Sequence, residues 1–166
     1  MKARFVYVHK EVNEGKLNSL EALYCVYRTY LQTCIDTILE KRCTKMPRGH
    51  FLHFFPGHPE LTVHLRRGAE AQALSITSGW FSLKYSQKLK ARISRLKREG
   101  LLTEEQAKSL YTTGKTQLSK PWKHATQEGI DLYWSWMLDE AIVGRRPSAP
   151  SRPTIVINAD SAKFKY

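Results

Sequence analysis

Four histidines lie close together in the chain and are the residues best suited to chemistry. The stretch HFLHFFPGHPELTVH contains His50, His53, His58 and His64. Imidazole is a common metal ligand and a common acid–base group. The spacing matches no HExxH or His-hydrophobic-His motif, however, and Glu60 is the nearest carboxylate. We therefore expect no metal and no cofactor, and a zinc- or manganese-dependent enzyme is the alternative that these histidines would support.

The three cysteines offer a second possible chemistry. Cys25, Cys34 and Cys43 are spaced nine residues apart, without any CxxC pair. An odd number of cysteines predicts no disulfide framework. Nine residues correspond to two and a half helical turns, so successive cysteines would point to opposite sides of one helix. We interpret them as buried or half-buried structural thiols, with reactive or metal-bound thiols as the alternative.

Recognisable catalytic patterns are missing from the rest of the sequence. There is no GxxxxGK[ST] loop, no GxGxxG turn and no GxSxG elbow. Asp131, Asp139 and Glu140 share one stretch, where solvent-facing roles suffice. Tyr111 and Tyr166 have no activating base at a recognisable spacing. We predict that the protein has no catalytic residues and is not an enzyme.

A basic stretch is the strongest functional signal. Residues 84–98 carry seven Lys or Arg and no acid. Tyr85, Leu89, Ile93 and Leu96 recur at helical spacing, which predicts one buried stripe with cations around it. Like charges four residues apart repel, so an anionic partner would relieve them. The predicted phosphate-contacting residues are Lys84, Lys88, Lys90, Arg92, Arg95, Lys97 and Arg98. The alternative is the solvated face of an ordinary helix.

The overall charge points to the same class of partner. The chain has 166 residues, and 27 Lys and Arg against 15 Asp and Glu leave a net charge of +12. Such a field attracts polyanions, so we expect nucleic acid as partner, RNA first and DNA second. Secondary contacts are predicted at Arg66, Arg67, Arg145 and Arg146. Trp80 and Tyr85 are candidates for base stacking, with a place in the core as their alternative role.

The sequence also predicts where the protein is located. No apolar run approaches the length of a membrane span, and the N-terminus MKARFVYVHK lacks a signal-peptide core. We expect a cytoplasmic protein with no membrane partner. Its hydrophobic content of 42% is that of a folded chain that buries a core, not of a disordered basic tail.

The elements predicted in the first half of the chain are a strand, a helix and a hairpin. RFVYV, residues 4–8, is β-branched and aromatic and predicts the strand. A helix should run to about Arg42 from a capping box formed by Asn18 and Glu21. The turn PGHPE separates two apolar runs and predicts a β-hairpin over about 50–66.

Helices dominate the predicted second half. We expect a helix over 69–99, bent at Gly79 and ended by Gly100, and then a helix begun by a Thr103–Gln106 capping box. A last helix should cover 122–143 and end at Gly144. The Pro-rich stretch 145–153 predicts a linker, and 154–166 a strand segment that pairs with 4–8. The predicted fold class is α+β, a mainly helical nucleic-acid-binding domain over 1–144 with a small β element.

The order of these elements resembles a known family. RFVYV, LNSLEALYCVYRTYLQTCIDTIL, ALSITSGWFSLKYSQKLKARI and RPTIVINADSAKFKY together resemble the N-terminal part of transposon-encoded TnpB proteins and type V CRISPR effectors. That part combines a strand-rich wedge with a helical lobe that holds the guide RNA and its duplex with DNA. The resemblance implies RNA or RNA–DNA duplex binding in antiviral defence. The family's RuvC nuclease domain has no counterpart here, so we expect a nuclease-free part, split subunit or fragment.

Two further functions remain as alternatives. One is a sequence-specific DNA-binding regulator, in which REGLLTEEQ joins two helices of a helix-turn-helix. The other is a structural or adaptor subunit of a ribonucleoprotein, in which the aromatic stretch Tyr133 to Met137 docks on a partner protein. A separate catalytic or ribonucleoprotein subunit is a possible partner in either setting.

Overall fold

The described part of the protein is helical. The computed structural model describes residues 14–42, 54–118 and 126–155, and within these ranges it contains no β-strand. The helices are α1 (Glu14–Glu40), α3 (Val63–Lys84), a π-helix η1 (Tyr85–Leu89), α4 (Lys90–Arg98), α5 (Glu104–Leu118), α6 (Gln127–Leu138) and α7 (Glu140–Val143). The prediction of a mainly helical fold is therefore confirmed, whereas the small β element is not supported. The predicted strand at 4–8 lies outside the described residues, as do residues 156–166 of the predicted strand segment 154–166, whereas Thr154 and Ile155 are described and form no strand.

Helix α1 begins earlier than predicted. Asn18 lies inside the helix, which starts at Glu14, so the proposed Asn18–Glu21 capping box is wrong. The apolar side of α1 divides into two parts. Tyr27, Leu31, Cys34 and Ile38 are at most 1% exposed, whereas Leu17, Leu20 and Tyr24 are 37–42% exposed. Only the C-terminal half of α1 is covered by other described elements.

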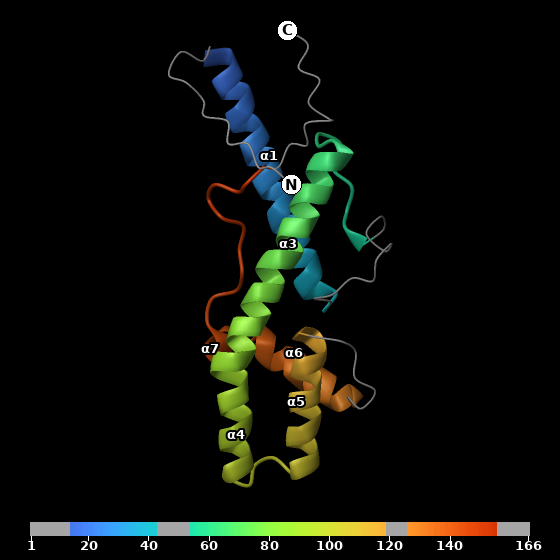
Figure 1. The fold of residues 1–166 in the computed structure, drawn as a ribbon, viewed down its shortest axis with the longest axis vertical. Helices are drawn as coiled ribbons and strands as arrows, with labels where there is room; N and C mark the ends of the chain where they lie inside the picture. Colours follow the sequence, from blue (N-terminus) through green and yellow to red (C-terminus); the bar gives the residue numbers. More distant parts are fainter. Residues whose placement is uncertain (1–13, 43–53, 119–125, 156–166) are drawn as a thin grey trace, which may run out of the picture.

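The buried half of α1 packs against α3, and this interface contains polar groups. Figure 1 shows the two helices crossing side by side in the upper part of the molecule, both directed toward the lower part. The Tyr30 hydroxyl donates to the Glu70 carboxylate at 2.8 Å, and it also lies 3.1 Å from the carbonyl oxygen of Pro56. Glu70 is 8% exposed, so its hydrogen bond compensates for lost hydration.

The predicted hairpin is wrong where the structure describes it. Val63, His64 and Leu65 form the first turn of α3 and not a second strand. The reason is a local cap: the side-chain oxygen of Thr62 accepts a hydrogen bond from the backbone N–H of Leu65, which starts a helix. Residues 50–53, the start of the predicted hairpin, lie outside the described ranges.

α3, η1 and α4 follow one another without a break and form the spine of the molecule (Figure 1). Gly79 lies within α3 and causes no interruption; the irregularity lies instead at η1, where the N–H of Lys90 bonds to the carbonyl of Tyr85. Buried residues recur every four positions along the spine: Ala69, Ala73, Thr77, Phe81, Tyr85, Leu89 and Ile93. A four-residue repeat drifts around an α-helix, so the buried side faces α1 first and α5 and α6 later.

The turn between α4 and α5 follows the sequence prediction closely. Gly100 has φ +72°, and the N–H groups of Gly100 and Leu101 bond to the carbonyls of Lys97 and Leu96, which is a Schellman motif. Thr103 and Gln106 form the predicted capping box through two reciprocal hydrogen bonds of 2.9 and 3.2 Å. α5 therefore returns antiparallel beside α4 (Figure 1).

The last predicted helix is divided in two. α6 ends at Leu138, and α7 begins after Asp139, whose carboxylate accepts the N–H of Ala141 at 2.9 Å. Gly144, with φ +77°, ends α7 as predicted. The start of the predicted helix, 122–125, lies outside the described residues. An N-capping aspartate within an otherwise continuous helical pattern explains the break.

Residues 144–155, which include the predicted linker at 145–153, have no helix or strand, and part of this stretch packs on the helices. The segment runs back from α7 toward α1 (Figure 1). The N–H of Ala149 donates to the Gln32 side chain at 2.8 Å, and Pro147 and Pro153 are buried. Among the described helices, none combines the length and apolar character needed to cross a membrane.

Candidate nucleic-acid interface

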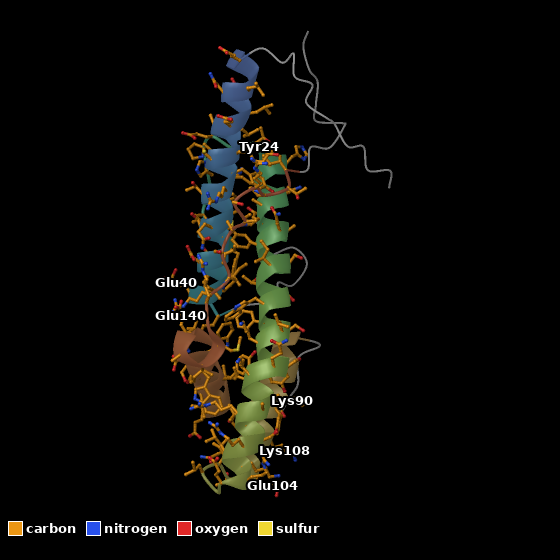
Figure 2. All side chains as sticks on the ribbon, turned by 90° about the vertical axis from the view of Figure 1, so that its left-hand side faces the viewer. Tyr24, Glu40, Lys90, Glu104, Lys108 and Glu140 are labelled. Atoms are coloured by element: carbon orange, nitrogen blue, oxygen red, sulfur yellow. The ribbon has the colours of Figure 1, made fainter. Side chains whose placement is uncertain are left out.

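The predicted phosphate-contacting residues lie along the lower half of the spine. Lys84 ends α3, Lys88 lies in η1, and the other five belong to α4. Lys88, Lys90, Arg95, Lys97 and Arg98 are exposed, while Lys84 and Arg92 are half-buried. Figure 2 shows Lys90 on the lower part of this spine. We call these seven residues the basic spine.

One flank of the basic spine is covered by α5. The hydroxyl groups of Ser94 and Tyr111 are 2.7 Å apart. The Lys97 ammonium donates to the Glu104 carboxylate at 2.7 Å. This bond raises the pKa of Lys97 and lowers the pKa of Glu104, because each charge stabilises the other. Glu104 therefore offsets one of the seven cations.

The opposite flank is covered by α6. The Arg92 guanidinium lies over the Trp136 ring, with its Cζ 5.1 Å from the ring centroid. Arg92 Nε is buried and has no hydrogen-bond partner among the described residues. The ring holds the guanidinium plane in place but satisfies none of its N–H donors. Arg92 is therefore an ordered cation with hydrogen-bonding capacity to spare.

The upper end of the basic spine meets the turn after α7. The Lys84 ammonium nitrogen lies 3.8 Å from the position that a Cβ on Gly144 would take. The Trp80 indole N–H donates to the carbonyl of Arg145 at 3.1 Å. The fold thus brings Arg145, a predicted secondary contact, beside Lys84 although the two are far apart in sequence.

The other secondary contacts do not join this surface in the same way. Arg146 pairs with Glu140 at 3.4 Å and donates to the Leu138 carbonyl at 3.0 Å, so it is already used within the protein. Arg66 and Arg67 lie in the first turns of α3. Twenty-one residues of helix separate Arg67 from Lys88, which is about 32 Å. They are a separate basic group at the other end of α3.

The two stacking candidates are occupied by the protein itself. Tyr85 is 6% exposed, and its hydroxyl donates to the Tyr111 carbonyl at 3.3 Å. Its ring packs so closely on α5 that a Cβ on Gly114 would lie 2.0 Å from it. Trp80 is half-buried and meets Phe81 edge-to-face at 5.0 Å. The core role is thus the one in which the structure places Tyr85, and Trp80 is a structural link to Arg145.

Part of the cationic density has an explanation within the fold. Arg95, Lys97 and Arg98 occupy the last turn of α4, where cations interact favourably with the helix dipole. Arg95 also lies 3.8 Å from the Glu99 carboxylate, an exposed pair of little energetic value. The dipole does not account for Lys88 and Lys90. Both are exposed and, among the described residues, neither makes an ion pair.

The histidines and cysteines are not brought together into a site. His58 meets the Tyr30 ring edge-to-face at 5.5 Å, and its buried Nδ1 has no partner within the described ranges. His64 is exposed on α3, and His50 and His53 lie outside the described residues. In the part of the chain that the structure describes, no three His, Cys, Asp or Glu residues form a group able to hold a metal ion.

The described cysteines lie in different surroundings. Cys34 is fully buried at the α1–α3 interface, and burial raises the pKa of its thiol to about 12. Cys25 is exposed, and Cys43 lies outside the described residues. The structural interpretation therefore fits Cys34, whereas Cys25 remains accessible.

Sequence reasoning missed two partners of the basic spine. Trp136 lay in the aromatic stretch that the adaptor alternative docks on a partner protein, and nothing in its spacing pointed to Arg92. Glu104 lay in a capping sequence, and only the α4–α5 turn brings it to Lys97. Glu99 could have been found, because it follows Arg95 by four residues on the same helix.

Known proteins give no guidance on this surface. Comparisons of the chain with protein-family models, with curated proteins and with solved structures found no match. The resemblance to TnpB proteins and type V effectors therefore stays a prediction, and the functional argument depends on the basic spine itself.

Proposed function

We propose that this chain is a non-catalytic, cytoplasmic nucleic-acid-binding protein that holds RNA or an RNA–DNA duplex through phosphate contacts from the basic spine. The resemblance noted above suggests its setting, a nuclease-free part of an RNA-guided effector that works with a separate catalytic or ribonucleoprotein subunit. Shape and backbone contacts would then hold the nucleic acid, while base pairing reads the sequence.

One observation carries the proposal. Lys88, Lys90 and Arg98 are exposed cations on a spine whose α4 packs on α5 and whose η1 contacts α6, and among the described residues no acid pairs with them. Their positions are fixed by the buried neighbours Leu89 and Ile93. Fixed cations without internal partners are suited to phosphates, because neutralisation of a phosphate releases condensed counterions.

The test compares two triple variants of equal charge. Lys88→Gln/Lys90→Gln/Arg98→Gln removes the unpaired cations of the basic spine. Arg28→Gln/Arg42→Gln/Arg152→Gln removes three exposed cations elsewhere, none of them a predicted contact. We expect the first variant to bind a structured RNA about tenfold more weakly or worse, with a salt slope smaller by about three. The control should bind like the wild type. Equal effects of the two variants would contradict the proposal.

The α4–α5 turn can be compared with the helix-turn-helix expected of a sequence-specific DNA-binding regulator. Helices of a helix-turn-helix cross at roughly 90–120°. α4 and α5 instead lie antiparallel, side by side, with Ser94 beside Tyr111 and Lys97 beside Glu104 (Figure 1). This geometry favours RNA binding over the regulator.

The second candidate function is that of a ribonucleoprotein adaptor. Its docking surface would lie on α1 and not on the predicted stretch Tyr133 to Met137. Tyr133, Trp134 and Met137 are at most 1% exposed, so this aromatic stretch is used in the core. Leu17, Leu20 and Tyr24 on α1 are exposed instead and favour a protein contact there. Purified protein that carries no nucleic acid, as judged by its ultraviolet absorbance ratio, would support the adaptor over the RNA-binding proposal.

A further inference from the structure

We infer that the basic spine binds a base-paired duplex by its backbone, without base stacking and without insertion of a helix into a groove. The inference rests on the proposed function and narrows its ligand class. Three features of the described surface lead to it: the state of the aromatic rings, the packing on both sides of α4, and the layout of the cations.

The aromatic rings beside the basic spine are not available to unpaired bases. Proteins that bind single strands usually combine cations with exposed rings on which bases stack. Here Tyr85 is buried, and Arg92 covers a face of Trp136. Trp80 is held by Phe81 and by the Arg145 carbonyl, and the Tyr111 hydroxyl is held by Ser94. Among the described residues, Tyr24 on the distant half of α1 is the exposed aromatic side chain.

The surroundings of Arg92 also favour phosphate contacts over the stacking of unpaired bases. A guanidinium plane can itself stack on an unpaired base. Arg92 is instead engaged by the Trp136 ring, whose centroid lies 5.1 Å from its Cζ, and the surrounding protein buries its Nε. The remaining N–H donors at the tip of the side chain suit phosphate oxygens, which accept hydrogen bonds in the guanidinium plane.

The packing of α4 prevents it from entering a groove. A helix with side chains is about 10–12 Å wide and nearly fills the DNA major groove, which is about 12 Å wide, so helices that contact it on both flanks obstruct its entry. α4 is fixed on one flank by Ser94 and Lys97 to α5, and on the other by Arg92 to α6. The outer side of α4, with Ala91, Arg95 and Arg98, is exposed, so α4 can contact the ridges of a duplex but not the base edges.

The cations form a rigid array that suits a rigid ligand. From Lys84 to Arg98 the spine is continuous helix, which extends about 21 Å. A duplex presents one phosphate charge per about 1.7 Å of its axis, twice the density of one of its strands. A stiff duplex can meet several fixed cations without a large loss of conformational freedom, whereas a flexible strand must be ordered to do so.

The experiment uses the full chain and three probes of about 20 nucleotides or base pairs. They are an RNA duplex, one of its strands alone with a sequence that does not fold, and a second RNA duplex of scrambled sequence. Binding is measured by fluorescence anisotropy over a series of salt concentrations, for the wild type and for the triple variant and its control. Trp80→Leu is measured in parallel, with helical content followed by circular dichroism.

We expect both duplexes to bind alike and at least about tenfold more tightly than the strand, with the steeper salt slope. Trp80→Leu, if folded, should leave the binding of the strand unchanged. Equal or tighter binding of the strand, or loss of strand binding in Trp80→Leu, would overturn the inference and leave the proposed function standing. A preference of more than tenfold for one duplex sequence would overturn it as well. If no probe shows salt-dependent binding, the proposed function itself fails.

Discussion

The two halves of the molecule differ in how they treat charged groups. In the upper half, α1 and α3 bury Tyr30 and Glu70 and pair them with each other. In the lower half, the buried polar residues Ser109 and Thr113 carry neutral hydroxyl groups, and the charged groups of Lys88 and Lys90 are left exposed. Figure 2 shows the contrast in position, with Tyr24 near the upper end and Lys90, Glu104 and Lys108 near the lower end.

This difference distinguishes polar groups that stabilise the fold from charged groups that remain available to a ligand. A buried polar pair that satisfies itself specifies how two helices fit together, and it offers nothing to a ligand. Exposed cations without partners contribute little to folding and leave their charge available. Charge alone therefore does not identify the binding surface; the distinction depends on whether the protein already satisfies that charge.

The largest expected effect concerns thiol reactivity in the upper half. In a Cys43→Ser background, Cys25 should react with a thiol reagent at pH 8, while Cys34 should react about a thousandfold more slowly or worse. Cys34 is fully buried, and its pKa of about 12 leaves roughly one thiol in ten thousand ionised at that pH. Mass spectrometry of labelled peptides measures both rates. Similar rates in the native protein would show that the α1–α3 interface opens readily.

The next effect tests the packing of the lower half. Gly114→Ala would place a Cβ 2.0 Å from the Tyr85 ring, so we expect the free energy of unfolding to fall by about 3 kcal/mol. Gly79→Ala is the matched control, because nothing lies within 4 Å of its Cβ and the helix there should gain about 0.5–1 kcal/mol. Urea unfolding measures both. A neutral Gly114→Ala would mean that Tyr85 does not hold α5 against the spine.

A smaller loss is expected from the polar pair of the upper half. Tyr30→Phe keeps the ring but leaves the Glu70 carboxylate without its donor, and an unsatisfied buried acceptor costs about 2 kcal/mol. Tyr24→Phe, at an exposed position on the same helix, is the control and should change the unfolding free energy little. If the two variants unfold alike, the Tyr30–Glu70 hydrogen bond does not contribute to the packing of α1 on α3.

The smallest expected effect is a change in RNA affinity that tests whether Lys97 belongs to the interface. Glu104→Gln removes the acid that pairs with Lys97, so it should raise affinity for an RNA duplex a few-fold and increase the salt slope by about one. Glu105→Gln, an adjacent exposed acid, is the control of equal charge change. Equal gains for both would mean that net charge, and not the release of Lys97, determines affinity.

The same pair predicts a pH dependence of stability. The lowered pKa of Glu104 gives a contribution that is present above the usual glutamate pKa and is lost as pH falls through the lowered value. The raised pKa of Lys97 gives one that is lost only as pH rises through the raised value. The melting temperatures of wild type and Glu104→Gln should therefore differ most near neutrality and converge in acid.

Local signals predicted the lower half of the fold well. The Gly100 turn, the Thr103–Gln106 capping box and the end at Gly144 all depend on residues within a few positions of one another. The predicted hairpin near Leu61–Leu65 was wrong because an N-cap at Thr62 decided between strand and helix for a short apolar run. The start of α1 was wrong because Asn18 is also tolerated inside a helix.

The candidate site was predicted only in part for a similar reason. Spacing placed the cations on the helix and predicted the burial of Tyr85, Leu89 and Ile93, since a helix fixes both through its own period, whereas Leu96 is only half-buried. Spacing could not show that the Tyr85 ring packs against Gly114, nor that the Arg92 guanidinium lies over the Trp136 ring. Those contacts join residues that are far apart along the chain.

The sequence by itself determined that this protein is mainly helical, strongly basic, and carries seven cations on one stretch of helix. Only the tertiary structure decided which of those cations are used internally and which remain open. Helical periodicity is a property of neighbouring residues, so it can be read from the chain. Whether Lys97 meets Glu104, or Lys88 meets nothing within the described residues, depends on how separate helices pack.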